Sequence, residues 1–406
     1  MRLQHLFLTA FFTATVGLAT AQTPTPNPAI PGPATAPAPT PPAPAPQSAK
    51  AWLLMDSATG QILAGENVDM PVEPASITKV MTSYVVAAEI KNGKIKDTDL
   101  VTISENAWRG GGGSTDGSTS FLPLNGQVNL AELEKGMVIQ SGNDAAIALA
   151  EHVAGSEQAF VSLMNSYAKR IGMKKTHFMN PHGLSAEGHI STAHDLALMG
   201  RAMIRDFPTA YAYNKMKEFT VNGITQHNRN GLLWKDPTVD GIKTGHTSGA
   251  GYCLLASAQR DNQRLISVVM GIESKSQAEG FRLREMGNLN LLNWGFRFFE
   301  SHTLYAAGAK IAEPKIWKGK ADLVSLGVAQ PMQINVPRGR YQELKPSMDL
   351  PKFVVAPLKK GQKVGTVRVS LDGKVVAERD LVALNDVEEA GFFGRLWDEF
   401  WMWWES

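Results

Sequence analysis

The stretch from Pro74 to Tyr84, PASITKVMTSY, decides the fold class of this 406-residue chain. Proline at position 74 suits the first turn of a helix, because its ring fixes φ and no N–H donor is needed there. Apolar residues then recur at helical spacing, and Asn92-Gly93 is a helix stop signal. Ser76 and Lys79 are three residues apart, so the pattern predicts that they share one face of the helix.

Ser76 and Lys79 have the chemistry of an activated nucleophile. A serine hydroxyl attacks weakly by itself and needs a base beside it. A lysine can be that base when burial or a second cation lowers its pKa. The spacing alone is a weak signal, since Ser166 and Lys169 repeat it in a stretch that we expect to be a solvated helix face.

Two further motifs follow in the chain and make the signal strong. Ser141-Gly142-Asn143 precedes a predicted helix at 143–152, and Ser141 with Asp144 matches a helix-capping pattern. Lys243-Thr244-Gly245 ends a predicted strand. A second S-x-N at 104–106 lacks this context. S-x-x-K, S-x-N and K-T-G in this order are typical of serine enzymes that penicillin acylates.

The motifs assign roles by elementary chemistry. Ser76 attacks a carbonyl carbon while Lys79 takes its proton, and Ser141 passes a proton to the leaving amine. Lys243 is the second cation, which lowers the pKa of Lys79 and attracts an anionic substrate. Thr244 is placed to hydrogen-bond a substrate carboxylate. The backbone N–H groups of Ser76 and His246 are candidate oxyanion donors.

From about residue 49 to its end, the chain resembles the serine-type D-Ala-D-Ala carboxypeptidases, which are low-molecular-mass penicillin-binding proteins with a C-terminal β domain and an amphipathic anchor. The resemblance rests on the three motifs and on six stretches: 74–84, 140–145, 177–184, 228–234, 240–247 and 291–299. It implies removal of the terminal D-alanine from peptidoglycan pentapeptide stems, acylation by β-lactams at Ser76, and a part in cell-wall remodelling and cell shape.

The resemblance also implies substrate-binding residues. Asn143 belongs to the S-x-N motif, and Arg229 matches one of two arginines near the substrate carboxylate. The other is Arg284, with Arg282 as a competitor because residues 274–280 are longer than in the family. His182 and His246 match positions near the cleft. For the deacylating water, either Lys79 or Ser141 could be the base.

Composition and periodicity give the domain organisation. With 43% hydrophobic and 19% charged residues, the chain can bury a core, and its length allows two domains. Strands at both ends of residues 49–305 with helices between them predict an α+β catalytic domain, an antiparallel sheet with a helical subdomain. Residues 306–385 predict a small all-β domain, in which Asp372-Gly373 joins two alternating strands as a hairpin turn.

The two ends of the chain differ from its middle. Residues 1–21 match a cleaved signal peptide, and the Pro/Ala/Thr-rich stretch 22–48 is expected to be a stiff linker. At the other end, residues 386–406 place Phe393, Trp397, Phe400 and Trp404 on one helical stripe. We therefore expect a periplasmic protein attached to the outer face of the inner membrane, where paired tails would favour a weak homodimer.

Several classes of function are excluded or disfavoured. A net charge of +2 gives no support for nucleic-acid binding, and the sequence holds neither metal-binding nor nucleotide-binding motifs, so no cofactor is predicted. A class A β-lactamase would need an E-x-x-L-N pattern, which is absent. A peptidoglycan endopeptidase and a non-catalytic wall-binding protein are the remaining alternatives. The glycine-rich segment 109–119 leaves the deacylation rate open. The sequence does not decide between monomeric peptide and polymeric wall as the substrate.

Overall fold

The computed structural model of the chain describes residues 40–111, 117–221 and 223–405. The predicted signal peptide and most of the predicted linker lie outside the described residues. The last linker residues are described, and they follow the surface of the catalytic domain. Trp294 Nε1 donates a 3.1 Å hydrogen bond to the carbonyl oxygen of Pro41, and Ala43 packs on the same apolar cluster.

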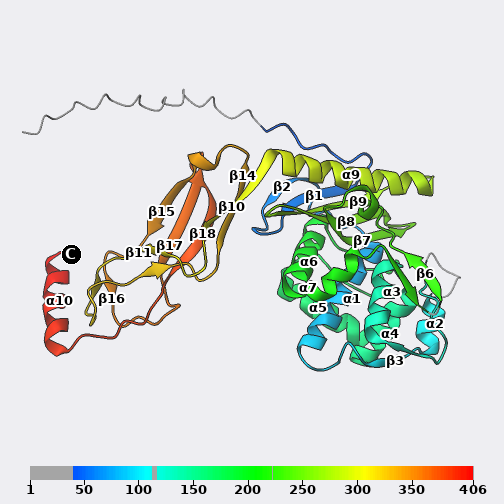
Figure 1. Cartoon of the computed structure of the whole chain (residues 1–406), viewed down its shortest axis with the longest axis horizontal. Helices are drawn as coiled ribbons and strands as arrows, with labels where there is room; N and C mark the ends of the chain where they lie inside the picture. The colour runs from blue at the N-terminus through cyan, green and yellow to red at the C-terminus, as the bar shows by residue number, and fades with distance from the viewer. Residues whose placement is uncertain (1–39, 112–116, 222, 406) are drawn as a thin grey trace, which may run out of the picture. The chain divides into compact units, whose positions relative to one another are not determined.

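The catalytic domain is built on one antiparallel sheet (Figure 1). Its strand order is β2-β1-β9-β8-β7, with bounds Ile62–Glu66, Ala51–Asp56, Gln263–Ile272, Gly251–Arg260 and Val239–Thr247. Strands β8 and β9 form a hairpin around Asp261-Asn262, with pairing that runs from Arg260 opposite Gln263 to Tyr252 opposite Ile272. Strands β1 and β9 are buried on both faces, so helices must cover the sheet on each side.

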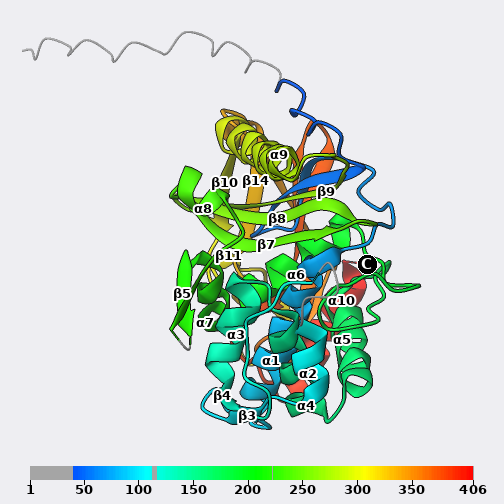
Figure 2. The ribbon, with the colours of Figure 1, turned by 90° about the vertical axis from the view of Figure 1, so that its right-hand side faces the viewer.

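Those helices form two layers, with α9 (Gln277–Phe298) and the short α8 (Leu232–Lys235) on one face of the sheet and the longer helices of the domain on the opposite face (Figure 2). The long members of the second layer are α1 (Lys79–Lys91), α3 (Leu130–Ile139), α4 (Asn143–Ala154), α5 (Glu157–Ile171) and α6 (Ala193–Asp206). Helix α1 is buried around almost its whole circumference, as expected for a helix surrounded by others. The α+β class predicted from sequence is therefore confirmed.

Two details differ from the sequence-based expectation. Helix α2 (Glu105–Gly111) extends into the glycine-rich segment 109–119, although glycine is unfavourable in a helix. A Cβ on Gly110 would lie 2.2 Å from the Ile147 side chain and one on Gly111 would lie 2.4 Å from that of Asp144, so these glycines let α2 approach α4. The Lys243-Thr244-Gly245 motif lies inside β7 and not at its end, since pairing with β8 continues to Thr247.

The C-terminal region is all β, as predicted. Strand β10 (Phe299–Tyr305) pairs with β14 (Met332–Pro337). A second sheet has the order β11-β13-β18-β17-β15, with bounds Lys310–Ala312, Leu326–Gly327, Lys374–Ala383, Lys363–Leu371 and Lys345–Asp349. Short strands β12 (Ile316–Trp317) and β16 (Val354–Val355) pair in parallel. Asp372 and Gly373, at φ +52° and +74°, make the predicted hairpin turn.

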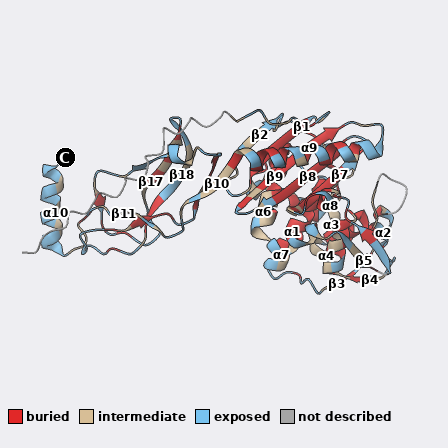
Figure 3. Ribbon diagram, turned by 45° about the horizontal axis from the view of Figure 1, so that its top comes forward, coloured by how far each residue is buried: buried red, intermediate tan, exposed pale blue. Residues whose placement is uncertain are grey.

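The chain ends in helix α10 (Phe392–Trp404), none of whose residues is buried (Figure 3). Phe393 is 84% exposed, and Trp397 and Trp404 are 65% and 69% exposed, so the aromatic stripe predicted from sequence faces solvent. Among the described residues, none of the helices has both the length and the apolar character needed to cross a bilayer.

Candidate active site

Ser76 lies in a tight turn between two buried elements. Residues Ala75–Thr78 form a 3-10 turn, and α1 starts directly after it at Lys79. The turn begins with Ala75 at φ +48°, a left-handed conformation that non-glycine residues rarely adopt. A Cβ on Gly245 of β7 would lie 2.9 Å from the Pro74 carbonyl oxygen. The K-T-G strand and the serine turn are therefore in direct backbone contact.

Lys79 is almost wholly buried and has three polar partners. Its Nζ lies 3.1 Å from Ser76 Oγ, 2.7 Å from Asn143 Oδ1 and 2.6 Å from the backbone oxygen of His182. The amide oxygen and the carbonyl oxygen are acceptors only. A neutral amine has two N–H groups and one lone pair, so using both N–H groups on these acceptors directs the lone pair toward Ser76 Oγ. The arrangement fits a base that takes the serine proton.

The electrostatics of the site favour the neutral amine. Burial, assisted by the charge of Arg229 and opposed by that of Asp144, lowers the pKa of Lys79 to about 7. Burial also holds the pKa of Lys243 well below its usual range, with Lys79, Arg229 and Arg284 contributing repulsion. Burial is the main cause for both amines, and the cation that lowers the pKa of Lys79 is Arg229 and not Lys243, the cation expected from the sequence.

Ser141 lies at the site in a left-handed backbone conformation, which is rare for a residue other than glycine. Its φ is +72°, and α4 begins two residues later with Gly142 as its N-cap. The predicted capping by Ser141 and Asp144 is wrong, because the Asp144 carboxylate accepts hydrogen bonds from the backbone N–H groups of Ser120 and Leu122 instead. Within the described residues, Ser141 Oγ and Asn143 Nδ2 are buried without a hydrogen-bond partner. Both are therefore available to a substrate.

The cleft above Ser76 has a volume of about 330 Å³. Its wall contains seven of the nine predicted site residues, and the other two, Lys79 and Lys243, are buried. The seven are Ser76, Ser141, Asn143, Arg229, Thr244, His246 and Arg284, and Phe281 and Gln277 of α9 join them.

Of the two competing arginines, the structure brings Arg284 to the cleft. Its side chain is buried, its guanidinium stacks on the Phe281 ring at 4.4 Å, and burial lowers its pKa to about 10. Nη2 donates to the backbone oxygen of Arg229 at 3.3 Å, so the two arginines are adjacent. Arg282 is exposed. His246 is exposed at the cleft edge and stacks on Tyr252, with ring centroids 4.1 Å apart.

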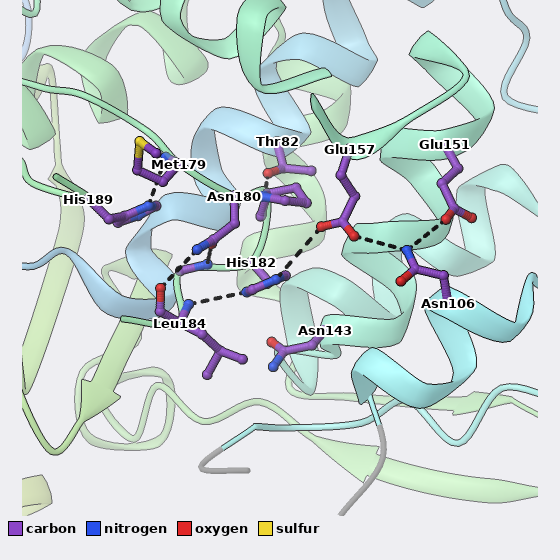
Figure 4. Close-up of polar contacts among 12 residues, drawn as sticks. Thr82, Asn106, Asn143, Glu151, Glu157, Met179, Asn180, His182, Leu184 and His189 are labelled. Atoms are coloured by element: carbon purple, nitrogen blue, oxygen red, sulfur yellow. Dashed lines mark hydrogen bonds and ion pairs between the residues drawn. The ribbon is translucent and has the colours of Figure 1, made fainter. Parts of the chain in front are cut away.

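The segment Asn180–Leu184 forms the other side of the Lys79 site (Figure 4). Thr82 Oγ1 donates to the Pro181 carbonyl oxygen at 2.6 Å, which fixes this segment against α1. Asn180 Oδ1 accepts from the Gly183 backbone N–H at 2.7 Å. The sequence singled out His182 for its ring, whereas its backbone oxygen makes the contact with Lys79, and no sequence motif reports a backbone contact of this kind.

Comparisons with known proteins find relatives over most of the chain. A model of the D-alanyl-D-alanine carboxypeptidase family matches residues 37–274, and one of the penicillin-binding protein 5 C-terminal domain matches residues 299–389. The chain is 49% identical to the D-alanyl-D-alanine carboxypeptidase DacC of Escherichia coli (strain K12) over 353 residues, which cover 86% of this chain and 87% of DacC. It is 48% identical to DacA of the same strain over 86% of each chain.

A solved structure, penicillin-binding protein 5 from Haemophilus influenzae, superposes with a TM-score of 0.79 at 46% identity and covers 84% of this chain and 98% of that one. The chain belongs to the D-alanyl-D-alanine carboxypeptidase family of serine peptidases, and the resemblance inferred from its motifs is thereby confirmed.

Proposed function

We propose that this carboxypeptidase cleaves the bond between the two terminal D-alanines of peptidoglycan pentapeptide stems through an acyl-enzyme on Ser76. The observation that carries the proposal is the buried Lys79, whose two acceptor partners direct its lone pair at Ser76 Oγ. Ser76 Oγ attacks the carbonyl carbon of the penultimate D-alanine while its proton moves to Lys79 Nζ. The C–N bond then breaks as Ser141 passes its proton to the departing amine and takes a proton from the protonated Lys79. Water then hydrolyses the ester, which releases the shortened peptide and restores Ser76.

Substrate binding follows from charge. The free carboxylate of the terminal D-alanine meets Thr244 and the adjacent guanidinium groups of Arg229 and Arg284, with Lys243 beneath. A bidentate guanidinium is well suited to a carboxylate. The backbone N–H groups of Ser76 and His246 are the proposed donors to the oxyanion. A β-lactam carries a carboxylate and a reactive carbonyl at a similar separation, so it would acylate Ser76 as well.

The location we propose is the periplasm, on the outer face of the inner membrane. Helix α10 supports it, because indole and phenyl groups exposed along one stripe suit the headgroup boundary of a bilayer. Residues 386–406 carry six acids and one base, whereas residues 306–385 carry 14 bases and seven acids. Attraction to anionic lipid would therefore come from the β region, and aromatic burial from the helix.

The test is release of D-alanine from a peptide ending in D-Ala-D-Ala by the mature full-length chain, beside Ser76→Ala and Lys79→Ala. We expect steady release by the wild type, none by Ser76→Ala, and covalent labelling by penicillin in the wild type but not in Ser76→Ala. Lys79→Ala should label at least about a hundredfold more slowly, because the serine loses its base. Release that persists in Ser76→Ala would refute the assignment.

A further inference from the structure

A polar chain of side chains leads from α2 to the Lys79 site, and neither the three motifs nor the proposed mechanism uses it. It begins at Asn106, in the second S-x-N of the sequence, and ends at His182 (Figure 4). Asn106 Nδ2 donates to Glu157 Oε1 at 2.9 Å, and Glu157 Oε2 lies 3.8 Å from His182 Nε2. We propose that Glu157 is a positioning residue, which orients His182 and thereby the carbonyl oxygen that holds Lys79.

The ring of His182 has a defined tautomer. Its Nδ1 accepts a hydrogen bond from the Leu184 backbone N–H at 3.2 Å, so Nδ1 carries no proton. Burial, together with the nearby Lys79, lowers the pKa of His182 to about 3, so the ring is neutral at physiological pH. The single proton is therefore on Nε2, which faces Glu157. Glu157 acts here as a carboxylate attracting an N–H dipole, and not as one half of an ion pair.

Glu157 is itself held in place from two sides. It is the first residue of α5, directly after the N-cap Ser156, where the helix dipole favours a negative charge. Asn106 Nδ2 also donates to Glu151 Oε1 at 2.9 Å, and Glu151 Oε2 accepts from Ser104 Oγ at 2.6 Å. The side chains of Ser104 and Asn106, from the second S-x-N, therefore connect the start of α2 to α4 and α5 by hydrogen bonds.

His182 connects this series of polar side chains to Lys79, the proposed base. The backbone oxygen of His182 is one of the two acceptors that orient the lone pair of Lys79, at 2.6 Å from Nζ. Asn180 and Thr82 fix the backbone on either side of His182, and Leu184 and Glu157 restrain its ring. Without Glu157, the Nε2–H loses the carboxylate that attracts it, and the ring gains freedom to rotate and shift its own peptide.

The experiment compares the full-length wild type with Glu157→Ala, Glu157→Gln and Asn106→Ala. Glu187→Gln is the matched control, since it removes one carboxylate from an exposed site five residues after His182. Release of D-alanine from a D-Ala-D-Ala peptide gives kcat and KM, penicillin labelling gives the acylation rate, and thermal unfolding reports the fold.

We expect kcat and the acylation rate to fall about tenfold in Glu157→Ala with KM within about twofold, because a slightly misoriented base slows chemistry more than binding. Glu157→Gln should recover part of the rate, since its amide oxygen still presents a partial negative charge to Nε2–H. Asn106→Ala should have a smaller effect, and the double variant Asn106→Ala/Glu157→Ala should be no slower than Glu157→Ala, because both residues act through one contact.

Unchanged kcat in Glu157→Ala would overturn the inference. A fall in kcat that only follows a loss of folded protein would also overturn it, as would an equal fall in Glu187→Gln. The inference rests on the proposed function, and the two fail differently. If the wild type released no D-alanine, the proposed function would fail. If the wild type and Glu157→Ala were equally active while Ser76→Ala was inactive, the role of Glu157 alone would fail.

Discussion

Gly183 and Ala75 are in backbone contact across the active site: a Cβ on Gly183 would lie 1.9 Å from the carbonyl oxygen of Ala75. The two residues are 108 positions apart in the sequence, and each is next to a residue that contacts Lys79. Gly183 follows the carbonyl that binds Lys79, and Ala75 precedes Ser76. The contact therefore joins the base-orienting segment to the nucleophile turn.

Replacing Gly183 by alanine should disrupt this contact. Its φ is +92°, so a side chain costs about 1–2 kcal/mol from conformation alone, and the clash adds roughly 1–3 kcal/mol. We expect a lower free energy of unfolding and much slower acylation by penicillin. Gly188→Ala is the control, since Gly188 has φ +80° but its nearest neighbour would be 3.9 Å from the new Cβ. Equal losses in the two variants would argue against a role for the contact.

Acylation should depend on pH through Lys79. Its pKa is lowered to about 7, and its neutral amine is the proposed base, so the acylation rate should rise with pH through about 7 and level off above it. Arg229→Gln removes a charge that lowers this pKa, so the midpoint should move to higher pH. Penicillin labelling at saturating concentration measures the profile. Arg170→Gln, an exposed arginine on α5, should leave the midpoint in place; a flat profile from pH 6 to 9 would contradict the assignment.

Glu134 should make stability depend on pH. This carboxyl is buried between α3 and α1, accepts from Ser83 Oγ, and burial raises its pKa to about 7. Between about pH 4.5 and 7 the folded state keeps a proton that the unfolded state has released, so stability falls as pH rises. Glu134→Gln should remove this slope, gaining on the order of 3 kcal/mol relative to wild type between pH 4.5 and 8.

Urea unfolding at several pH values measures this slope. Glu132→Gln is the matched control, because Glu132 is exposed on the same helix. If both substitutions changed the pH dependence equally, buried Glu134 would not be its source.

Helix α10 should bind a lipid surface through its aromatic stripe. Replacing Trp397 and Phe400 by serine should lower partition into phospholipid vesicles at least about tenfold, because each ring contributes about 1.5–3 kcal/mol when buried. Glu399→Gln, on the polar face, should bind as well as the wild type. Vesicle sedimentation measures binding, and the release of D-alanine from a soluble peptide should be the same in all three proteins. Undiminished binding of the double variant would refute anchoring through α10.

The sequence by itself determined the family, the α+β and all-β regions and the identity of the chemical groups. These are properties of short segments: Ser76 and Lys79 are one helical turn apart, and Asp372-Gly373 favours a two-residue turn wherever it occurs. Local periodicity also placed the aromatic stripe of α10, because a helix face depends only on residue spacing.

The tertiary structure decided which groups act on one another. Asn143 and the His182 oxygen lie 64 and 103 residues from Lys79, and only packing of α4 and the 180–184 segment against α1 makes them its acceptors. The choice of Arg284 over Arg282, the left-handed Ser141 and the carboxylate of Glu157 near His182 arise in the same way. Hydrogen bonds and burial depend on distances between elements, and residue spacing along one element carries no information about them.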